Sequence, residues 1–242
     1  MNKNQRLLPF YSQTHYISEY VQCQASDQLD KMISKISGVQ EDLSDTIFFT
    51  TNSVIWAYGG SGVGKTLYAL NRSFSDPKIC YIACSALPIV DFECAIENAL
   101  NEVVVIFDDT DIFLKKSRVE KFFFSFLKRT TATTIFLSRH SPHQLVFELA
   151  DFESRVKQAF SVKFHLPDTI QLGKILSANA KARGIILSPA VFQFILNNGP
   201  RNPGKLALLL NHLDTYTLEI GKKLTIPIIR QFFDIRKPYI DK

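Results

Sequence analysis

Apolar residues change their spacing repeatedly along the chain from about residue 50 onward. Short continuous apolar runs predict buried strands, whereas apolar positions three or four residues apart predict helices. Strands and helices that alternate in this way are typical of a parallel sheet flanked by helices. We predict strands at 53–58, 78–84, 103–107, 133–137 and 161–164, and helices at 66–73, 91–100, 117–128 and 148–159.

The pattern changes at Pro167 and Asp168. Proline is accepted at the start of a helix, and beyond this point the apolar spacing is helical with no further long strand. The sequence therefore predicts an α/β fold followed by a small all-α domain, with an N-terminal segment at 1–20, the α/β domain at 21–166 and the helical domain at 167–242. Predicted helices of the last domain are 169–183, 188–197, 204–220 and 226–233.

A glycine-rich loop joins the first predicted strand to the first predicted helix. It fits GxxxxGK[ST] with Gly59, Gly60, Ser61, Gly62, Val63, Gly64, Lys65 and Thr66. In such loops the backbone N–H groups surround phosphates, the lysine reaches the β- and γ-phosphates and the hydroxyl ligates magnesium. A glycine turn that binds nothing is the alternative, and the strand and helix on either side argue against it.

Two carboxylates, Asp108 and Asp109, follow the strand at 103–107. Ligands of open α/β sheets bind at the carboxyl ends of strands, so we expect Asp108 to hold magnesium and Asp109 to polarise the attacking water. A helix cap or turn is the alternative reading of an acidic pair. The strand at 133–137 ends in polar residues up to His140, which would lie beside the γ-phosphate if that strand is between the other two; a surface histidine is the alternative.

Arg155 and Arg201 are further candidates for the site. Phosphoryl transfer gains from a guanidinium that neutralises developing charge, whether it comes from the same chain or from a neighbour. A solvated charge or a surface ion pair is the alternative for any arginine.

Composition narrows the class of protein without selecting a partner. The chain has 46% hydrophobic and 21% charged residues, and its 28 Lys and Arg against 23 Asp and Glu are spread along it, which permits nucleic-acid contact without favouring it. The four cysteines form no CxxC pair, which argues against a zinc or redox site. No apolar stretch has the length of a signal peptide or membrane span, so we expect no membrane association and a cytoplasmic location.

The order of these parts resembles the DnaA branch of the AAA+ ATPases, and within it the Hda-like regulators of replication initiation. The likeness is strongest in four segments, at 141–145, 151–155, 182–184 and 223–227. It implies a AAA+ sheet with a helical lid, bound ADP or ATP with magnesium, Arg155 as an arginine finger acting on ATP held by DnaA, and Arg201 as the lid arginine called sensor 2. His140 falls at the sensor 1 position, where the family usually has an acidic residue.

The N-terminal segment adds a docking motif by the same resemblance. Gln5, Leu8, Pro9 and Phe10 look like the short peptide by which Hda-like proteins bind the β subunit of the DNA polymerase sliding clamp. An extended peptide with apolar anchors suits a shallow hydrophobic pocket, and proline stiffens it. The alternative is a tail that packs Leu8 and Phe10 on its own domain.

The resemblance implies a protein that, with the DNA-loaded clamp, stimulates hydrolysis of DnaA-bound ATP and so represses re-initiation of chromosome replication. We expect one helix between the second and third strands and no DNA-binding domain after the lid, which separates the chain from initiators, and DNA contact only through the clamp. Hda-like loops are often degraded, whereas Lys65 and Thr66 are intact here. The alternatives are a helicase-loader or transposition-helper ATPase and a nucleotide-binding scaffold. Oligomeric state, the working nucleotide and hydrolysis by the chain itself stay open.

Overall fold

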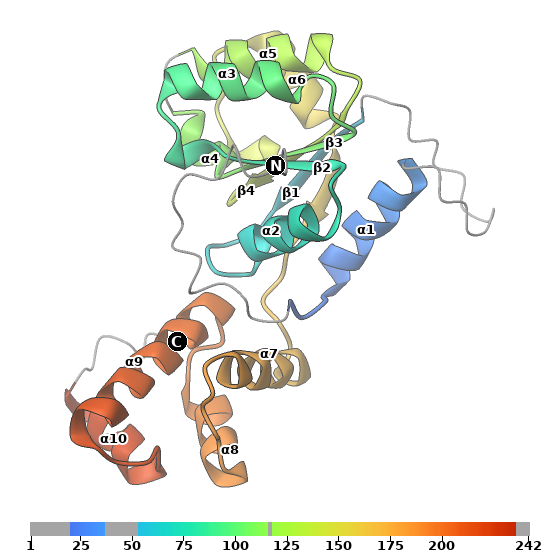
Figure 1. The fold of residues 1–242 in the computed structure, drawn as a ribbon. Coiled ribbons are helices and arrows are strands. Elements are labelled where there is room, and N and C mark those ends of the chain that lie inside the picture. Colours follow the sequence, from blue (N-terminus) through green and yellow to red (C-terminus); the bar gives the residue numbers. More distant parts are fainter. Residues whose placement is uncertain (1–19, 37–52, 116–117, 236–242) are drawn as a thin grey trace. The chain divides into compact units, whose positions relative to one another are not determined.

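The computed structural model describes residues 20–36, 53–115 and 118–235, which fold into two compact units (Figure 1). Of the described residues, the α/β unit contains 24–36, 53–60, 65–115 and 118–164. The helical unit contains residues 165–235 together with two short segments from earlier in the chain, 20–23 and 61–64. A phosphate-loop motif that is continuous in sequence therefore contributes to both units.

A five-stranded sheet forms the centre of the α/β unit. Its strands are β1 (Val54–Tyr58), β2 (Ile79–Ala83), β3 (Val104–Asp108), β4 (Thr133–Ser138) and β5 (Phe160–Lys163), in the order β2-β3-β4-β1-β5. Every pairing is parallel, as predicted. Because β4 lies between β1 and β3, the ends of the phosphate-loop strand, the polar strand and the acidic strand meet at one edge of the sheet.

Helices cover both faces of this sheet, with α3 (Ile89–Ala99), α5 (Val119–Arg129) and α6 (Ala150–Lys157) on one side and α1 (Gln24–Ile36) and α2 (Lys65–Ser75) on the other (Figure 1). Short helical turns, α4 (Thr110–Phe113), η2 (Cys84–Ala86) and η3 (Pro142–Gln144), follow three of the strands. Residues 79–108 are all described, and α3 is the one α-helix between β2 and β3, as predicted.

An aromatic cluster fills the space between β3, β4 and the helices on the α3 side. Phe107 stacks on Phe136 with ring centroids 5.5 Å apart, and Phe123 of α5 packs edge-on against both. Such ring pairs add about 0.5–1.5 kcal/mol each beyond the area that they bury. The cluster fixes β3 and β4 against α5 and so fixes the strand ends that carry the polar residues.

The helical unit consists of α7 (Thr169–Ala182), α8 (Pro189–Asn198), α9 (Pro203–Ile220) and α10 (Ile226–Ile235). Leucines dominate its core, among them Leu172, Leu176, Leu206 and Leu210, all nearly inaccessible. As predicted, residues 165–235 contain no strand, and the structure describes all of them. Among the described residues of the whole chain, no helix is both long enough and apolar enough to cross a membrane.

Candidate nucleotide-binding site

The phosphate loop begins at the edge where β1 meets β4. Gly59 donates its backbone N–H to the carbonyl oxygen of Ser138, 3.1 Å away, which ties the start of the loop to the end of β4. A side chain at Gly59 would place its Cβ 2.4 Å from the carbonyl oxygen of Phe164, so only glycine fits. The loop therefore lies against the sheet edge rather than projecting from it.

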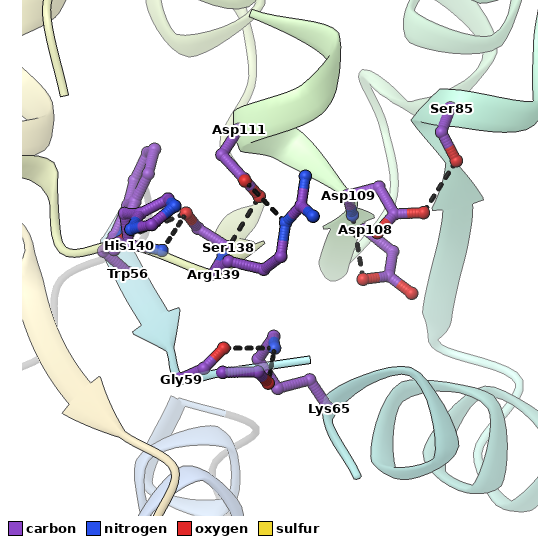
Figure 2. Close-up of polar contacts among 11 residues, drawn as sticks. Trp56, Gly59, Lys65, Ser85, Asp108, Asp109, Asp111, Ser138, Arg139 and His140 are labelled. Carbon is purple, nitrogen blue, oxygen red and sulfur yellow. Dashed lines mark hydrogen bonds and ion pairs between the residues drawn. The ribbon is translucent and has the colours of Figure 1, made fainter. Parts of the chain in front are cut away.

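Lys65 opens α2 and turns its ammonium back into the loop. Its Nζ donates to the carbonyl oxygens of Gly59 (2.6 Å) and Gly60 (3.0 Å), as Figure 2 shows. Burial lowers the pKa of the Lys65 ammonium, and the neighbouring carboxylate of Asp108 opposes this shift. A buried ammonium at the N-terminus of an eleven-residue helix is an arrangement suited to a phosphate group.

The tip of the loop, residues 61–64, contacts α9 within the helical unit. Gly62 has a φ of +77°, and its carbonyl oxygen accepts from the backbone N–H of Gly204, 3.0 Å away. Asn202 caps α9 and also donates from Nδ2 to the carbonyl oxygen of Ser61 at 2.6 Å. Arg201, the neighbour of Asn202, donates to the hydroxyl of Thr169. Arg201, the predicted sensor 2 arginine, and the tip of the loop therefore both belong to the helical unit.

Asp108 ends β3 and is 2% exposed. Its carboxylate accepts hydrogen bonds from the Tyr81 hydroxyl (3.0 Å), from the backbone N–H of Asp109 (2.8 Å) and from the side chain of Thr66. Burial raises the pKa of the Asp108 carboxyl, and these hydrogen bonds oppose the shift. The two predicted magnesium ligands, Asp108 and Thr66, are therefore in contact with each other.

The side-chain oxygens of Asp108 and Thr66 are of the kind that magnesium binds. Mg²⁺ in nucleotide sites binds one or two protein oxygens together with phosphate oxygens and water, and a hydroxyl beside a buried carboxylate supplies such oxygens. Across the described residues, no group of three or more His, Cys, Asp or Glu side chains is placed to hold a metal by itself. Asp108 and Thr66 would thus hold the ion jointly with a bound nucleotide.

Asp109 has a strained backbone and an unusual side-chain partner. It stands at the N-cap of α4 with φ 54° and ψ 33°, in the left-handed region that non-glycine residues seldom occupy, and its side chain makes no capping hydrogen bond. Instead its Oδ2 accepts from the hydroxyl of Ser85, 2.6 Å away (Figure 2). Helix capping therefore does not account for the Asp109 carboxylate, and backbone strain of this kind concentrates at functional sites.

The polar end of β4 lies between the other two strands, as its predicted role required. The backbone of His140 makes two hydrogen bonds there: its carbonyl oxygen accepts from Trp56 Nε1 (2.9 Å) and from the Ser138 hydroxyl (2.8 Å). The preceding residue, Arg139, donates from both its backbone N and its Nε to Asp111 at 3.0 Å. Arg139 was not among the predicted site residues, and its place directly after β4 is the one sequence signal that pointed to it.

Arg155 lies on α6, which is anchored on α5 at both ends. The carboxylate of Glu120 on α5 accepts from the backbone N–H groups of Glu148 and Leu149 at the start of α6. Arg155 itself is exposed and donates from Nη1 to the carbonyl oxygen of Leu127 near the end of α5, 3.1 Å away. The predicted clamp-binding residues Gln5, Leu8, Pro9 and Phe10 lie outside the described residues.

Comparison with known proteins agrees with the fold and the helical unit. Residues 170–233 match the family model of the Hda lid domain. An uncharacterised protein of Haemophilus influenzae (strain ATCC 51907 / DSM 11121 / KW20 / Rd) is 24% identical over 200 residues, covering 80% of this chain and 84% of that protein.

Two solved structures of DnaA share the fold at low sequence identity. Domain III of the Thermotoga maritima replication initiation protein DnaA has a TM-score of 0.71 at 15% identity and covers 97% of this chain and 100% of its own. AMPPCP-bound DnaA from Aquifex aeolicus has a TM-score of 0.59 at 17% identity and covers 84% of this chain and 67% of its own. The chain therefore shares its fold with these DnaA structures, and its helical unit contains a lid domain of the Hda type.

Proposed function

We propose that this chain is a cytoplasmic regulator that binds ADP or ATP with magnesium, docks on the β sliding clamp through Gln5 to Phe10, and presents Arg155 to ATP held by DnaA. Hydrolysis of that ATP would then repress re-initiation of replication. The observation that carries the proposal is the joint presence of an Hda-type lid and an exposed arginine on an anchored helix.

The setting of Arg155 suits a finger that acts on another molecule. Glu120 fixes the start of α6, so the helix is held while the guanidinium at its far end stays accessible. Its one hydrogen bond among the described residues goes to a neutral backbone carbonyl of Leu127. A phosphate oxygen carries full charge and is the stronger acceptor, so the guanidinium would exchange partners when DnaA-bound ATP approaches.

A hydrolysis assay on DnaA tests this proposal. DnaA-bound ATP is incubated with DNA-loaded clamp and either the original chain or Arg155→Ala. Arginine fingers contribute about 10³–10⁵-fold to phosphoryl transfer, so we expect Arg155→Ala to remove nearly all stimulation.

The matched control is Arg129→Ala, since Arg129 is also an exposed arginine near the end of α5 but is paired with Glu97 in a surface ion pair. It should retain full stimulation, because surface pairs of this kind contribute about 1 kcal/mol or less. Stimulation that survives in Arg155→Ala would reject the finger and leave a nucleotide-binding scaffold.

A second candidate function is an ATPase of the helicase-loader or transposition-helper type, and the completeness of the chain's own site favours it. Lys65 in the loop, the contact between Thr66 and Asp108, and the adjacent Asp109 are the parts that ATP hydrolysis needs. DNA-dependent ATP turnover by the isolated chain, without any clamp binding, would select this function over the regulator.

A further inference from the structure

The first turn of α9 uses its backbone donors on the chain itself. Its first residue, Pro203, has no N–H. The second, Gly204, donates to the carbonyl oxygen of Gly62 at 3.0 Å, and the third, Lys205, donates to Asn202 Oδ1 at 3.0 Å. The N-terminus of a helix ordinarily attracts an anion. Here the one donor of this turn that the cap does not satisfy holds the tip of the phosphate loop.

Asn202 joins the loop tip to α9 through both ends of its side-chain amide. Its Oδ1 accepts from Lys205 and caps the helix, while its Nδ2 donates to the carbonyl oxygen of Ser61 at 2.6 Å. An N–H group on one side and a carbonyl oxygen on the other leave a single orientation of the amide. Two consecutive carbonyl groups of the loop, those of Ser61 and Gly62, therefore both face the start of α9.

Two glycines allow this close approach. A Cβ at Gly62 would lie 2.2 Å from Asn202 Oδ1, and the φ of +77° at Gly62 is one that other residues rarely adopt. A Cβ at Gly204 would lie 3.1 Å from the Cα of Gly62, closer than ordinary van der Waals contact. A side chain at Gly62 is therefore excluded, and one at Gly204 would press the loop away from the helix.

The peptide bond transmits this contact to the other side of the loop. In a planar trans peptide unit, the C=O of one residue and the N–H of the next point in opposite directions. The described residues contain no cis peptide bond. Because the carbonyl groups of Ser61 and Gly62 face α9, the N–H groups of Gly62 and Val63 face away from it. Backbone N–H groups of such loops are the groups that surround phosphates.

We propose that Asn202 is a positioning residue for nucleotide binding, which holds the Ser61 carbonyl group and so directs the N–H groups of Gly62 and Val63 at the phosphates. The inference rests on the nucleotide binding in the proposed function and deepens it, because it assigns the conformation of the loop tip to the helical unit. Without the Nδ2 donor the peptide groups of the tip rotate more freely, and ordering them then opposes binding.

The variant Asn202→Ser tests the proposal. Serine caps a helix about as well as asparagine, so α9 keeps its cap and loses the Nδ2 donor. Dissociation constants for ADP and for pyrophosphate, each with magnesium, are measured by isothermal titration calorimetry on the full chain. Loss of one hydrogen bond should weaken binding about two- to ten-fold. The factor should be the same for both probes, because pyrophosphate has the phosphates without base or ribose.

Two further variants separate the lost donor from other effects of substitution. Asn202→Asp keeps the shape and the cap but places an oxygen opposite the Ser61 carbonyl oxygen, so it should lose at least as much affinity as Asn202→Ser. Asn198→Ser is the matched control in the same unit. Asn198 is exposed near the end of α8 and donates to the carbonyl oxygen of Phe194 within its own helix, so its replacement should change neither affinity.

A loss for ADP without a loss for pyrophosphate, or no loss for either probe, would overturn the role of Asn202 and leave nucleotide binding standing. If the original chain binds neither probe, the nucleotide binding in the proposed function is rejected, and amide hydrogen exchange decides whether Asn202 holds the loop. The N–H of Gly204 should then exchange faster in Asn202→Ser than in the original chain, and equal rates would overturn the inference.

Discussion

At the scale of single residues, the site balances buried charge against hydrogen bonds. Asp108 is almost fully buried and accepts from Tyr81, Thr66 and the neighbouring backbone N–H, yet burial dominates and raises the pKa of its carboxyl. In the protein without ligand this carboxylate is therefore a source of instability. A magnesium ion at the same position would remove that penalty, since it favours the charged form.

Asp108→Asn should consequently stabilise the unliganded chain in a pH-dependent way. A raised pKa means that the folded state binds the proton more tightly than the unfolded state, so stability falls as pH rises from about 3.8 through the raised value. Asparagine carries no charge, so the variant should unfold at a higher temperature near pH 7 and lose this advantage as pH falls below 4. Thermal unfolding of both chains across this range, without nucleotide or metal, provides the measurement. A difference that does not vary with pH would show that burial of this charge is not the cause.

Residues of the site divide into those that sequence predicts and those that it does not. Lys65, Thr66 and Asp108 were predictable because each follows a strand within a motif whose chemistry is known, and the structure brings them together. Tyr81 and Ser85 were not, because their contacts with Asp108 and Asp109 depend on β2 being the neighbour of β3. The orientation of Arg139 was equally hidden, since it depends on the burial of Asp111.

At the scale of elements, helix ends are fixed by specific caps. The first helix of the helical unit, α7, begins with a capping box in which Asp168 accepts from the backbone N–H of Gln171, and the Gln171 side chain accepts from the backbone N–H of Asp168. Two N–H groups that the helix cannot satisfy itself are satisfied in this way. Sequence predicted this boundary correctly because the proline and the acidic residue are both local signals.

Asp168→Ala should weaken this start. Loss of an N-cap costs about 1 kcal/mol, so we expect a small decrease in the free energy of unfolding. The decrease should be the same with and without nucleotide. Urea unfolding followed by circular dichroism measures it. Glu219→Ala is the control, since Glu219 is exposed near the C-terminal end of α9, where a carboxylate gives the helix no support. Equal stability of Asp168→Ala and the original chain would show that the cap is dispensable.

Two helices, α1 and α4, were not predicted from the sequence, and each has a physical reason for this. The strands were recognisable because β3 and β4 are buried at every position and each contains a continuous apolar run, at 104–107 in β3 and at 135–137 in β4. Helix α1 precedes the alternation of strands and helices, and its exposed face is polar throughout much of its length. Helix α4 has only four residues, too few for a period to be visible.

At the scale of the whole molecule, the proposed regulator needs two surfaces with separable roles, the N-terminal peptide for the clamp and Arg155 for DnaA. Deletion of residues 1–10 should abolish binding to the sliding clamp and clamp-dependent stimulation of DnaA, while leaving the affinity for nucleotide unchanged. Surface plasmon resonance on immobilised clamp, together with nucleotide titration, measures both quantities. Arg155→Ala should retain binding to the clamp and lose only the stimulation of DnaA. Persistent clamp binding after the deletion would place the docking peptide elsewhere in the chain.

The way in which Lys65 donates to Gly59 and Gly60 has a consequence for the protein between nucleotides. The Lys65 ammonium has two oxygen partners in its own loop. It therefore keeps hydrogen-bond acceptors when a phosphate leaves. Nucleotide entry is then an exchange of neutral carbonyl oxygens for anionic ones, and nucleotide exit is the reverse. The chain should consequently stay folded between the release of one nucleotide and the binding of the next.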